Sequence, residues 1–401
     1  MLKHYILWVG IKEGLSLVFF QDKTPSKVVT TLFKLNKKWG KKDRSFVAET
    51  LYDIVRWKAK IQAAIETEID ESNLFEAIGV WFIIKGEKEL PNFKEFQNIN
   101  SEKIHFHFNE NKNTPTVKYS LSNFLYNKGL ESFGKEKWHT ELEELNASAT
   151  TILRVNSNKT NLNNLKISLT KENTETTTVE GFESALALKD KKNILNTEAY
   201  SKGFFEIQDA SSQLVAPFLE VKPNQIVIDC CAGAGGKSLH LSNLMNNKGK
   251  IYALDIYYNK LTELERRKKL AGDKIIEPVL VDENLNFNQL FEIADRVLID
   301  VPCSGIGTLK RNPGLKWSIT EEKFKNIVKL QQELLQTYSS FLKPKNGILV
   351  YSTCSIFPEE NQNQIKLFLK NNPTFSLLKE KVIFPSESGF DGFYMASLSK
   401  I

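Results

Sequence analysis

The chain has 401 residues, 41% of them hydrophobic, and a formal net charge of +6. This length exceeds what a single core of ordinary size requires, so we expect two or three domains. No apolar run approaches the roughly 20 residues of a membrane span, and the apolar start MLKHYILWVG is followed by charges without a small-residue cleavage site. Four cysteines, two of them adjacent at 230–231, make a poor disulfide framework. We therefore expect a cytoplasmic protein that does not enter a membrane.

The first 60 residues carry the positive charge, with 13 Lys and Arg against 5 Asp and Glu. Residues 3–70 are predicted to be helical, because apolar side chains such as Phe46, Val47 and Leu51 recur at helical spacing. A basic segment of this kind can contact the phosphates of a nucleic acid. A lysine-rich helix face exposed to solvent explains the same composition, and charge alone does not separate the two interpretations.

The middle of the chain gives weaker signals. We interpret NINSEKIHFHFNENKNTPTVKYS (98–120) as a loop that holds at most one strand. TTILRVNSNKT (150–160) is predicted to contain a strand, LNNLKISLTKE (162–172) a short helix, and KENTETTTVEG (171–181) a polar connection.

From about residue 203 short apolar runs alternate with helical stretches, which is typical of a parallel, doubly wound α/β sheet. Ligands of such sheets bind outside the carboxyl ends of the strands. Five polar or thiol side chains are expected near these ends: Asp229, Asp255, Asp282, Asp300 and Cys354. Core packing does not explain why acidic and thiol groups would collect at one edge.

The glycine-rich segment DCCAGAGGKS (229–238) links the first of these strands to a helix. A phosphate-binding P-loop requires glycine where this chain has Cys231, and a dinucleotide GxGxxG motif requires glycine at Ser238. Phosphate binding is therefore not the favoured interpretation. The glycines still allow a ligand to approach the backbone closely.

Asp255 follows Gly233 by 22 residues and is expected at the end of the second strand, where a carboxylate can bind both hydroxyls of a ribose. Asp282 follows the third strand and can reach an adenine amino group. Contacts to ribose and adenine without a diphosphate site indicate S-adenosylmethionine. For any single Asp, a helix cap or a solvated turn is the simpler explanation.

Cys303 and Cys354 both follow predicted strands on the ligand edge, whereas Cys230 is expected to be a buried apolar side chain. A zinc site is disfavoured because no CxxC occurs, and we expect no metal. A cysteine protease would need an oriented histidine, and only His240 lies in this half of the chain. A methyl donor beside two cysteines suggests cytosine methylation: a thiolate adds at carbon 6, which makes carbon 5 able to take up a methyl group. Asp300 can then hydrogen-bond the N3/N4 edge of the base, which must leave any stack to reach the site.

Several long segments, in this order, resemble the Sun/Fmu-type (RsmB/NOP-like) RNA cytosine-5 methyltransferases. They are LRVN (153–156), GFFEIQDASSQLVA (203–216), the glycine loop, DVPCSGIGTLKRNPGLKW (300–317), YSTCSIFPEENQ (351–362) and DGFYMASLSK (391–400). The segment KKDRSFVAETLYDIVRW (41–57) is similar, over a shorter length, to the NusB-like RNA-binding domain of some members.

The resemblance implies an α/β fold in three parts. These are a helical NusB-like region (1–140), a small RRM-like α/β segment (141–202) and a Rossmann-like methyltransferase domain (203–401). It implies that Cys354 is the nucleophile and that Cys303 assists release of the product. It assigns the cofactor and target-base contacts to Cys231, Ala232, Gly233, Ala234, Gly235, Gly236, Lys237, Asp255, Asp282 and Asp300. The family often has proline where this chain has Ala234, which makes the loop less rigid without removing a contact group.

The expected function is S-adenosylmethionine-dependent RNA cytosine-5 methylation by a monomer, with rRNA favoured over tRNA as the substrate. Three alternatives remain open. Pro302–Cys303 resembles the attacking dipeptide of DNA methyltransferases. A non-catalytic RNA-binding assembly factor is disfavoured by the presence of both cysteines and Asp300. A P-loop nucleotidase is disfavoured by Cys231.

Overall fold

The structure is a computed structural model that describes residues 4–190 and 192–400. The chain divides into two compact units. The first, which we call the helical unit, comprises the residues up to Ala147 together with Leu309–Glu321. The second, the α/β unit, comprises Ser148–Thr308 and Glu322–Ile401. The chain thus leaves the α/β unit after Thr308, contributes a short segment to the helical unit, and returns.

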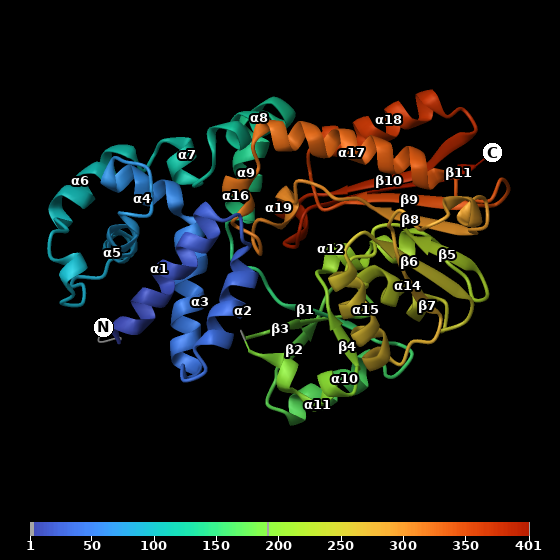
Figure 1. Cartoon of the computed structure of the whole chain (residues 1–401), viewed down its shortest axis with the longest axis horizontal. Helices are drawn as coiled ribbons and strands as arrows, with labels where there is room; N and C mark the ends of the chain where they lie inside the picture. The colour runs from blue at the N-terminus through green and yellow to red at the C-terminus, as the bar shows by residue number, and fades with distance from the viewer. Residues whose placement is uncertain (1–3, 191, 401) are drawn as a thin grey trace. The chain divides into compact units, whose positions relative to one another are not determined.

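The helical unit is built from ten α-helices among its described residues, shown from blue to green, with α16 in orange, in Figure 1. They are α1 (Tyr5–Phe20), α2 (Pro25–Leu35), α3 (Lys41–Arg56), α4 (Lys58–Ile65), α5 (Leu74–Ile84), α6 (Ser101–Asn111), α7 (Pro115–Lys118), α8 (Asn123–Phe133), α9 (Lys135–Leu145) and α16 (Leu315–Ser318). The core lies among α1, α3 and α5, where Trp8, Leu51 and Ile78 are almost fully buried. The expectation of helices over residues 3–70 is met for the described residues from Tyr5 onward.

The interpretation of residues 98–120 as a loop with at most one strand is wrong, because helices α6 and α7 occupy this segment. The alternating letters IHFHF suggested a strand, but only Ile104 and Phe108, four residues apart, pack against the core, and Phe106 is 62% exposed. That spacing belongs to one face of a helix. Asn100 caps the N-terminus of α6 by accepting a hydrogen bond from Lys103 N at 3.0 Å.

The segment Leu309–Glu321 is fixed within the helical unit by buried polar contacts. The ammonium group of Lys316, which is fully buried, donates to Asn146 Oδ1 at 2.5 Å and to the carbonyl oxygen of Arg56 at 3.1 Å. The indole of Trp317 donates to the carbonyl oxygen of Val55 at 2.6 Å. Burial of Lys316 lowers its pKa well below the usual value. The segment is therefore part of the packed interior of the helical unit.

The α/β unit begins with a small antiparallel sheet in the order β2-β3-β1-β4. Its elements are β1 (Ile152–Val155), α10 (Leu162–Lys171), β2 (Thr176–Thr178), β3 (Ala185–Leu188), α11 (Glu198–Ser201) and β4 (Phe205–Ile207). The strand and helix expected over 150–172 are present. The expectation of a polar connection over 171–181 needs correction, because the threonines 176–178 form strand β2 at the edge of the sheet. Threonine favours strands because of its branched β-carbon, and an edge strand tolerates polar side chains on its outer face.

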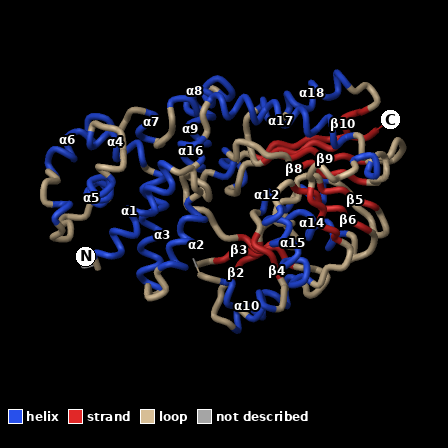
Figure 2. Tube along the Cα trace, viewed as in Figure 1, coloured by secondary structure: helices blue, strands red, loops and turns tan. Residues whose placement is uncertain are grey.

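The large sheet has seven strands in the order β10-β11-β9-β8-β5-β6-β7. The five strands from β9 to β7 in this order are parallel, and β11 and β10 are antiparallel additions beyond β9. The strands are β5 (Ile226–Asp229), β6 (Lys250–Asp255), β7 (Ile276–Leu280), β8 (Arg296–Asp300), β9 (Ile348–Thr353), β10 (Phe375–Ile383) and β11 (Phe393–Lys400). Figure 2 shows both sheets in red.

Helices cover the large sheet on both faces. Helices α17 (Glu321–Ser339) and α18 (Gln362–Asn371) pack on one face, and α14 (Gly236–Leu244) and α15 (Tyr258–Ala271) on the other, each with its own apolar cluster (Figure 1). Short helices α12 (Ala210–Gln213), α13 (Val215–Phe218) and α19 (Pro385–Ser388) complete the unit. The α/β, Rossmann-like fold expected from the sequence is confirmed. No helix in the described ranges is long and apolar enough to cross a bilayer.

Candidate active site

The glycine loop lies between β5 and α14 and is connected directly to the end of β6. The backbone N–H of Gly233 donates to Asp255 Oδ2 at 2.8 Å, and that of Tyr257 donates to Asp255 Oδ1 at 2.9 Å. Lys260 Nζ lies 3.9 Å from Asp255 Oδ2. Asp255 is thus held as an acceptor with one side next to the loop. Each carboxylate oxygen has a further lone pair for a hydroxyl donor.

The loop has room for a ligand at one point and is closely packed at another. Gly233 has φ +56°, and a β-carbon there would meet no atom within 4 Å. Gly235 has φ +80°, and a β-carbon there would lie 2.0 Å from Leu264 Cδ1. Glycine at 235 is therefore required by packing and backbone, whereas the space at Gly233 is open to a ligand.

Asp229, at the end of β5, is fully buried below this loop. Its Oδ2 accepts from Ser238 Oγ at 2.7 Å, while its Oδ1 has no hydrogen-bond partner among the described residues. Burial raises the pKa of Asp229 to about 7, and the hydrogen bond from Ser238 opposes this shift. After Asp255, the apolar side chain of Ile256 is 60% exposed. A free buried acceptor, an open glycine, a carboxylate and an exposed apolar side chain fit a nucleoside-bearing cofactor such as S-adenosylmethionine.

Lys237 and Asp300 form an ion pair at the ends of neighbouring elements. Lys237 Nζ donates to Asp300 Oδ2 at 2.6 Å, and Ser352 Oγ donates to Asp300 Oδ1 at 2.8 Å. Burial by itself lowers the pKa of Lys237, but the charge and hydrogen bond of Asp300 outweigh it, so the pKa lies above its usual value. The ammonium also lies 5.3 Å from the ring centroid of Phe393. The charge-assisted hydrogen bond from Lys237 therefore fixes the orientation of the Asp300 side chain.

The two cysteines singled out in the sequence meet in space. Cys303 Sγ and Cys354 Sγ lie 3.0 Å apart, and the backbone N–H of Cys354 points to Cys303 Sγ at 3.3 Å. Both side chains are partly exposed. The loops that carry them are joined by a hydrogen bond from Gly307 N to the carbonyl oxygen of Cys354 at 3.0 Å. A β-carbon at Gly307 would lie 2.1 Å from the carbonyl oxygen of Gly392, so no side chain fits at this crossing.

The surroundings of Cys303 oppose the loss of its proton. The hydrogen bond with Cys354 raises the pKa of the Cys303 thiol well above its usual value, and burial and the charge of Glu360 add to the effect. The thiol form of Cys303 is therefore favoured at neutral pH. Burial also raises the pKa of Cys231 and of Cys230, so neither supplies a thiolate at neutral pH.

Some residues singled out in the sequence lie apart from these contacts. Asp282 lies two residues beyond the end of β7, is exposed, and accepts a hydrogen bond from Asn284 N at 2.9 Å within its own turn. Cys231 and Ala232 lie at the base of the loop, where Ala232 N donates to the carbonyl oxygen of Leu254. The structure therefore brings together Gly233 with Asp255, Lys237 with Asp300, and Cys303 with Cys354, while Asp282 serves a local turn.

Three charged residues at the glycine loop were missed by the sequence reasoning. Arg154 Nη1 donates to the carbonyl oxygen of Gly236 at 2.8 Å, and Arg267 Nη1 donates to that of Ala234 at 2.7 Å. Glu206 pairs with Arg267 at 2.5 Å and lies directly opposite Arg154 in the β1–β4 register. The small sheet thus supports the cofactor loop. The signal in the sequence was the charged residue Arg154 inside the apolar strand LRV, because a buried arginine requires fixed acceptors.

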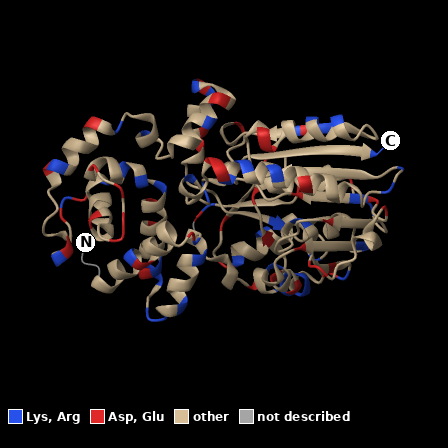
Figure 3. Cartoon of the chain, turned by 45° about the horizontal axis from the view of Figure 1, so that its top comes forward, with Lys and Arg blue, Asp and Glu red and all other residues tan. Residues whose placement is uncertain are grey.

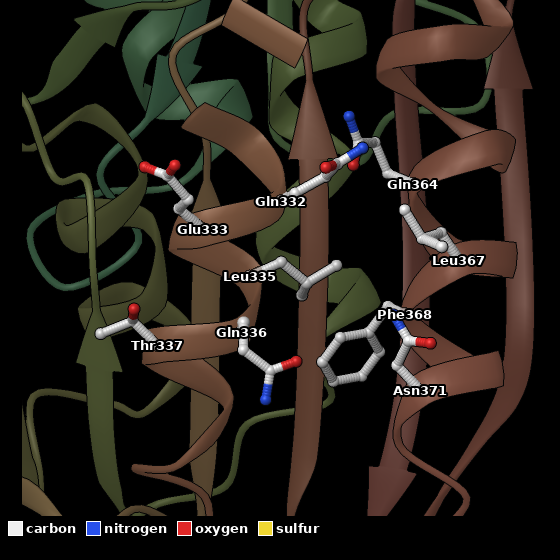
Figure 4. A pocket seen from close by; sticks show the side chains of 9 residues that line it. All are labelled: Gln332, Glu333, Leu335, Gln336, Thr337, Gln364, Leu367, Phe368 and Asn371. Atoms are coloured by element: carbon white, nitrogen blue, oxygen red, sulfur yellow. The ribbon is translucent and has the colours of Figure 1, made fainter. Parts of the chain in front are cut away.

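A cavity of about 410 Å³ lies between α17 and α18, lined by Gln332, Leu335, Gln364 and Phe368 among others (Figure 4). None of the residues predicted to bind cofactor or target base lines it. It lies on the helix layer, away from the carboxyl ends of the strands, and we do not assign it to the active site.

Comparison with known proteins places most of the chain among rRNA methyltransferases. Residues 216–399 match the family model described as 16S rRNA methyltransferase RsmB/F, and residues 122–195 match the ferredoxin-like domain of the same group. A probable ribosomal RNA small subunit methyltransferase B of Synechocystis sp. is 34% identical over 71% of this chain and 67% of its own length. The corresponding protein of Vibrio cholerae is 32% identical, and the match spans 66% of this chain and 62% of that protein.

Among solved structures, the crystal structure of PH0851 matches the whole chain over its own whole length, with a TM-score of 0.84 and 25% sequence identity. The match therefore includes both units. The paired cysteines, the ion pair of Lys237 with Asp300 and the glycine loop lie in the α/β unit, which contains the region matched by the methyltransferase model apart from the segment Leu309–Glu321. The chain belongs to the RsmB/F family of 16S rRNA methyltransferases.

Proposed function

We propose that this chain methylates carbon 5 of a cytosine in small-subunit rRNA and uses S-adenosylmethionine as the methyl donor. The observation that carries the proposal is the 3.0 Å contact between Cys303 Sγ and Cys354 Sγ beside Asp300. A single attacking cysteine needs no second thiol. A reaction that forms and then breaks a carbon–sulfur bond benefits from one sulfur that attacks and another that holds a proton.

Cys354 is the proposed nucleophile. Its Sγ forms a bond to carbon 6 of the flipped cytosine, and the electron pair of the 5,6 double bond moves to carbon 5. After carbon 5 has been methylated, loss of its proton to a base restores the double bond and expels the Cys354 thiolate. Cys303, whose pKa is raised, would donate a hydrogen bond to that departing sulfur across the 3.0 Å contact. This arrangement favours Cys354 over Cys303 as the attacking group.

Asp300 and Lys237 are proposed to bind the edge of the base. A carboxylate of Asp300 accepts from the exocyclic amine, and its orientation is fixed by Lys237 and Ser352. These groups are fixed before the base enters, so little reorganisation is needed.

S-adenosylmethionine supplies an electrophilic methyl group on a sulfonium when it is bound. Asp255 would hold its ribose hydroxyls. The open space beside Gly233 would let the cofactor come close to the loop backbone, and Ile256 would cover its adenine. Asp282 is exposed in the turn that follows β7, and from there it would accept a hydrogen bond from the adenine amino group. The remaining loop residues, from Cys231 to Lys237, shape the site through their backbone.

We further propose the three-part division of labour expected from the sequence. Residues 1–140 would act as a NusB-like RNA-binding region, 141–202 as an RRM-like segment, and 203–401 as the catalytic domain, with the exception that Leu309–Glu321 packs in the helical unit. The chain is proposed to act as a monomer.

The test is incubation of the purified chain with S-adenosylmethionine and, in separate reactions, unmodified small-subunit rRNA and unmodified tRNA, followed by bisulfite sequencing. A single protected cytosine is expected. Protection of a tRNA cytosine instead would replace rRNA by tRNA as the substrate. Binding of rRNA without any protected cytosine, by a chain that binds S-adenosylhomocysteine, would favour an assembly factor and contradict the proposal.

Four exposed lysines, two in the connection after α2 and two at the start of α3, are predicted to contact RNA phosphates; Figure 3 colours all Lys and Arg residues blue. The four are Lys37, Lys38, Lys41 and Lys42. Replacing all four with glutamine should weaken RNA binding and reduce the slope of log affinity against log salt by up to about 3, because each lost phosphate contact removes roughly 0.7–0.9. Filter binding between 50 and 300 mM salt measures this slope.

A matched control replaces four exposed lysines of α17 and α18 with glutamine. They are Lys325, Lys329, Lys366 and Lys370. This variant loses the same formal charge, so a general charge effect would change both slopes equally. Equal slopes in the two variants would assign the basic segment to a solvated helix face.

Arg267→Gln is predicted to weaken S-adenosylhomocysteine binding about tenfold or more. The variant loses a charge-assisted hydrogen bond to the carbonyl oxygen of Ala234, a type of contact worth roughly 1.5–3 kcal/mol. Calorimetry on the purified chain measures the affinity. The control is Arg266→Gln, whose side chain pairs with Glu263 on the surface of the same helix. Unchanged affinity in folded Arg267→Gln would show that the loop keeps its shape without this arginine.

A further inference from the structure

The most concentrated polar network outside the groups already discussed surrounds Glu360. This residue ends the short 3-10 helix Pro358–Glu360 and is fully buried. It makes no ion pair with Lys or Arg among the described residues. A buried carboxylate without a cation is costly unless hydrogen bonds replace its water shell, so the donors around Glu360 define what the residue does.

On one side Glu360 holds the loop that carries Cys303. Its Oε1 accepts from the backbone N–H of Ser304 at 2.7 Å, and its Oε2 accepts from Ser304 Oγ at 2.5 Å. Gln331, on α17, donates both to Glu360 Oε1 at 3.1 Å and to the carbonyl oxygen of Pro302 at 3.0 Å. The residues before and after Cys303 are therefore both tied to the same carboxylate, directly or through Gln331.

On the other side Glu360 holds the loop that carries Cys354. Ser355 Oγ donates to Glu360 Oε2, and the Ser304 and Ser355 hydroxyl oxygens lie 3.3 Å apart. Tyr351 donates its hydroxyl to the carbonyl oxygen of Glu360 at 2.7 Å, which fixes the backbone of the residue. One carboxylate thus bridges Ser304 and Ser355, the immediate neighbours of the two cysteines.

The number of donors indicates the charge state. Four groups, the Ser304 N–H, the Ser304 and Ser355 hydroxyls and the Gln331 amide, all point at the two oxygens. An ionised carboxylate accepts from all of them, whereas a protonated one would lose an acceptor site. Burial raises the pKa of Glu360, and the hydrogen bonds from Ser304 and Ser355 oppose that shift.

We propose that Glu360 is a positioning residue that bridges the two cysteine loops, so that the sulfurs stay in contact. Beside the hydrogen bond with Cys354 and burial, its negative charge adds to the opposition to ionisation of Cys303. The proposal deepens the proposed methyl transfer and rests on it for its functional meaning. The other groups that face Cys303 are Cys354 at the end of β9 and Tyr351 within β9, and Asp300, paired with Lys237, lies near Tyr351. Of these, Glu360 is the charged group adjacent to the Cys303 loop.

The test uses alkylation by iodoacetamide, which reads the thiolate fraction of each cysteine without RNA or cofactor. Initial rates at Cys303 and Cys354 are measured against pH by peptide mass spectrometry, and again in a Cys354→Ala background, where Cys303 titrates without its coupled neighbour. In Glu360→Gln the midpoint for Cys303 should fall by about one pH unit or more, because a buried like charge has been removed. Glu333→Gln, at an exposed position of α17, should leave it unchanged.

An unchanged Cys303 profile in folded Glu360→Gln, checked by thermal unfolding, would overturn the charge role. Ser355→Ala tests the bridge alone, because it keeps the charge and removes one tie to the Cys354 loop. It should leave the Cys303 profile in place and lower kcat about tenfold with little change in KM for RNA. A kcat equal to that of the unmodified chain would overturn the bridging role.

The two proposals fail separately. If the chain methylates no RNA while Glu360→Gln still shifts the Cys303 profile, the proposed function is wrong and the effect of Glu360 on Cys303 stands. If methylation occurs and the profile does not shift, the function stands and the role given to Glu360 is wrong.

Discussion

Cys354→Ala should abolish methyl transfer and leave no covalent RNA adduct, while Cys303→Ala should trap one. Without Cys354 no sulfur adds to carbon 6, and carbon 5 stays a poor nucleophile, so the rate should fall on the order of 10⁴-fold or more. Without Cys303 the adduct still forms through Cys354, but the departing thiolate loses the hydrogen bond of its neighbour 3.0 Å away. The adduct should appear as a slow band on a denaturing gel after incubation with RNA and S-adenosylmethionine.

The double variant Cys303→Ala/Cys354→Ala is the control, because it should lose the band seen with Cys303→Ala alone. If Cys303 were the attacking group, as the Pro302–Cys303 dipeptide allows, the pattern would be inverted, with a band only when Cys303 is present. If both cysteines only fill space, neither variant gives a band, and each loses stability on the order of 1–3 kcal/mol. The gel therefore distinguishes three roles in one experiment.

Asp229→Asn should make the α/β unit more stable at neutral pH and weaken cofactor binding. Burial raises the pKa of Asp229 to about 7, above the roughly 3.9 of an unfolded chain. The folded state therefore binds the proton more tightly, and its contribution to stability, fully present below pH 4, is lost as pH rises through 7. The asparagine does not titrate, so its advantage over aspartate should be about 3 kcal/mol larger at pH 8 than at pH 5.

Urea unfolding at pH 5 and pH 8, followed by far-ultraviolet circular dichroism, measures this difference. Tryptophan fluorescence would not, because all six tryptophans lie in the helical unit. A pH-independent difference between variant and parent would mean that Asp229 has an ordinary pKa in the folded chain. Calorimetry should show that Asp229→Asn binds S-adenosylhomocysteine more weakly than the parent chain. The reason is that Asp229 Oδ1 is the unpartnered buried acceptor below the loop.

The α/β sheet was predictable because its parallel strands are short, mostly apolar runs, and all of them except β7 end in a polar residue, as in KIYALD before Ile256. The helix Ser101–Asn111 was not, because IHFHF alternates like a strand and only tertiary packing selects Ile104 and Phe108 as its inner face. The meeting of Cys303 with Cys354 followed from parallel strand order, since β8 and β9 are neighbours.

Glu360 and Arg154 illustrate what the sequence did not supply. Both are charged residues of types that are usually exposed. Each is buried because its main hydrogen-bond partners lie far away in the chain: Gly236 accepts from Arg154, and Gln331 donates to Glu360. For Asp282 the contact with a ligand stays a prediction, and the structure adds that one of its carboxylate oxygens accepts from the backbone N–H of Asn284 in its own turn. Partners distant in sequence leave no periodic or local pattern to recognise.

The docking of Leu309–Glu321 in the helical unit affects the order in which the chain can fold during synthesis. Lys316 and Trp317 complete the interior of that unit, yet the ribosome reaches them only after it has made Ser148–Thr308. At about 5–20 residues per second this delay is on the order of 10 s. During that time the helices of the first 147 residues have emerged without the segment that closes their core. The N-terminal unit is therefore the first to be synthesised, but it cannot be finished before most of the catalytic sheet has left the ribosome.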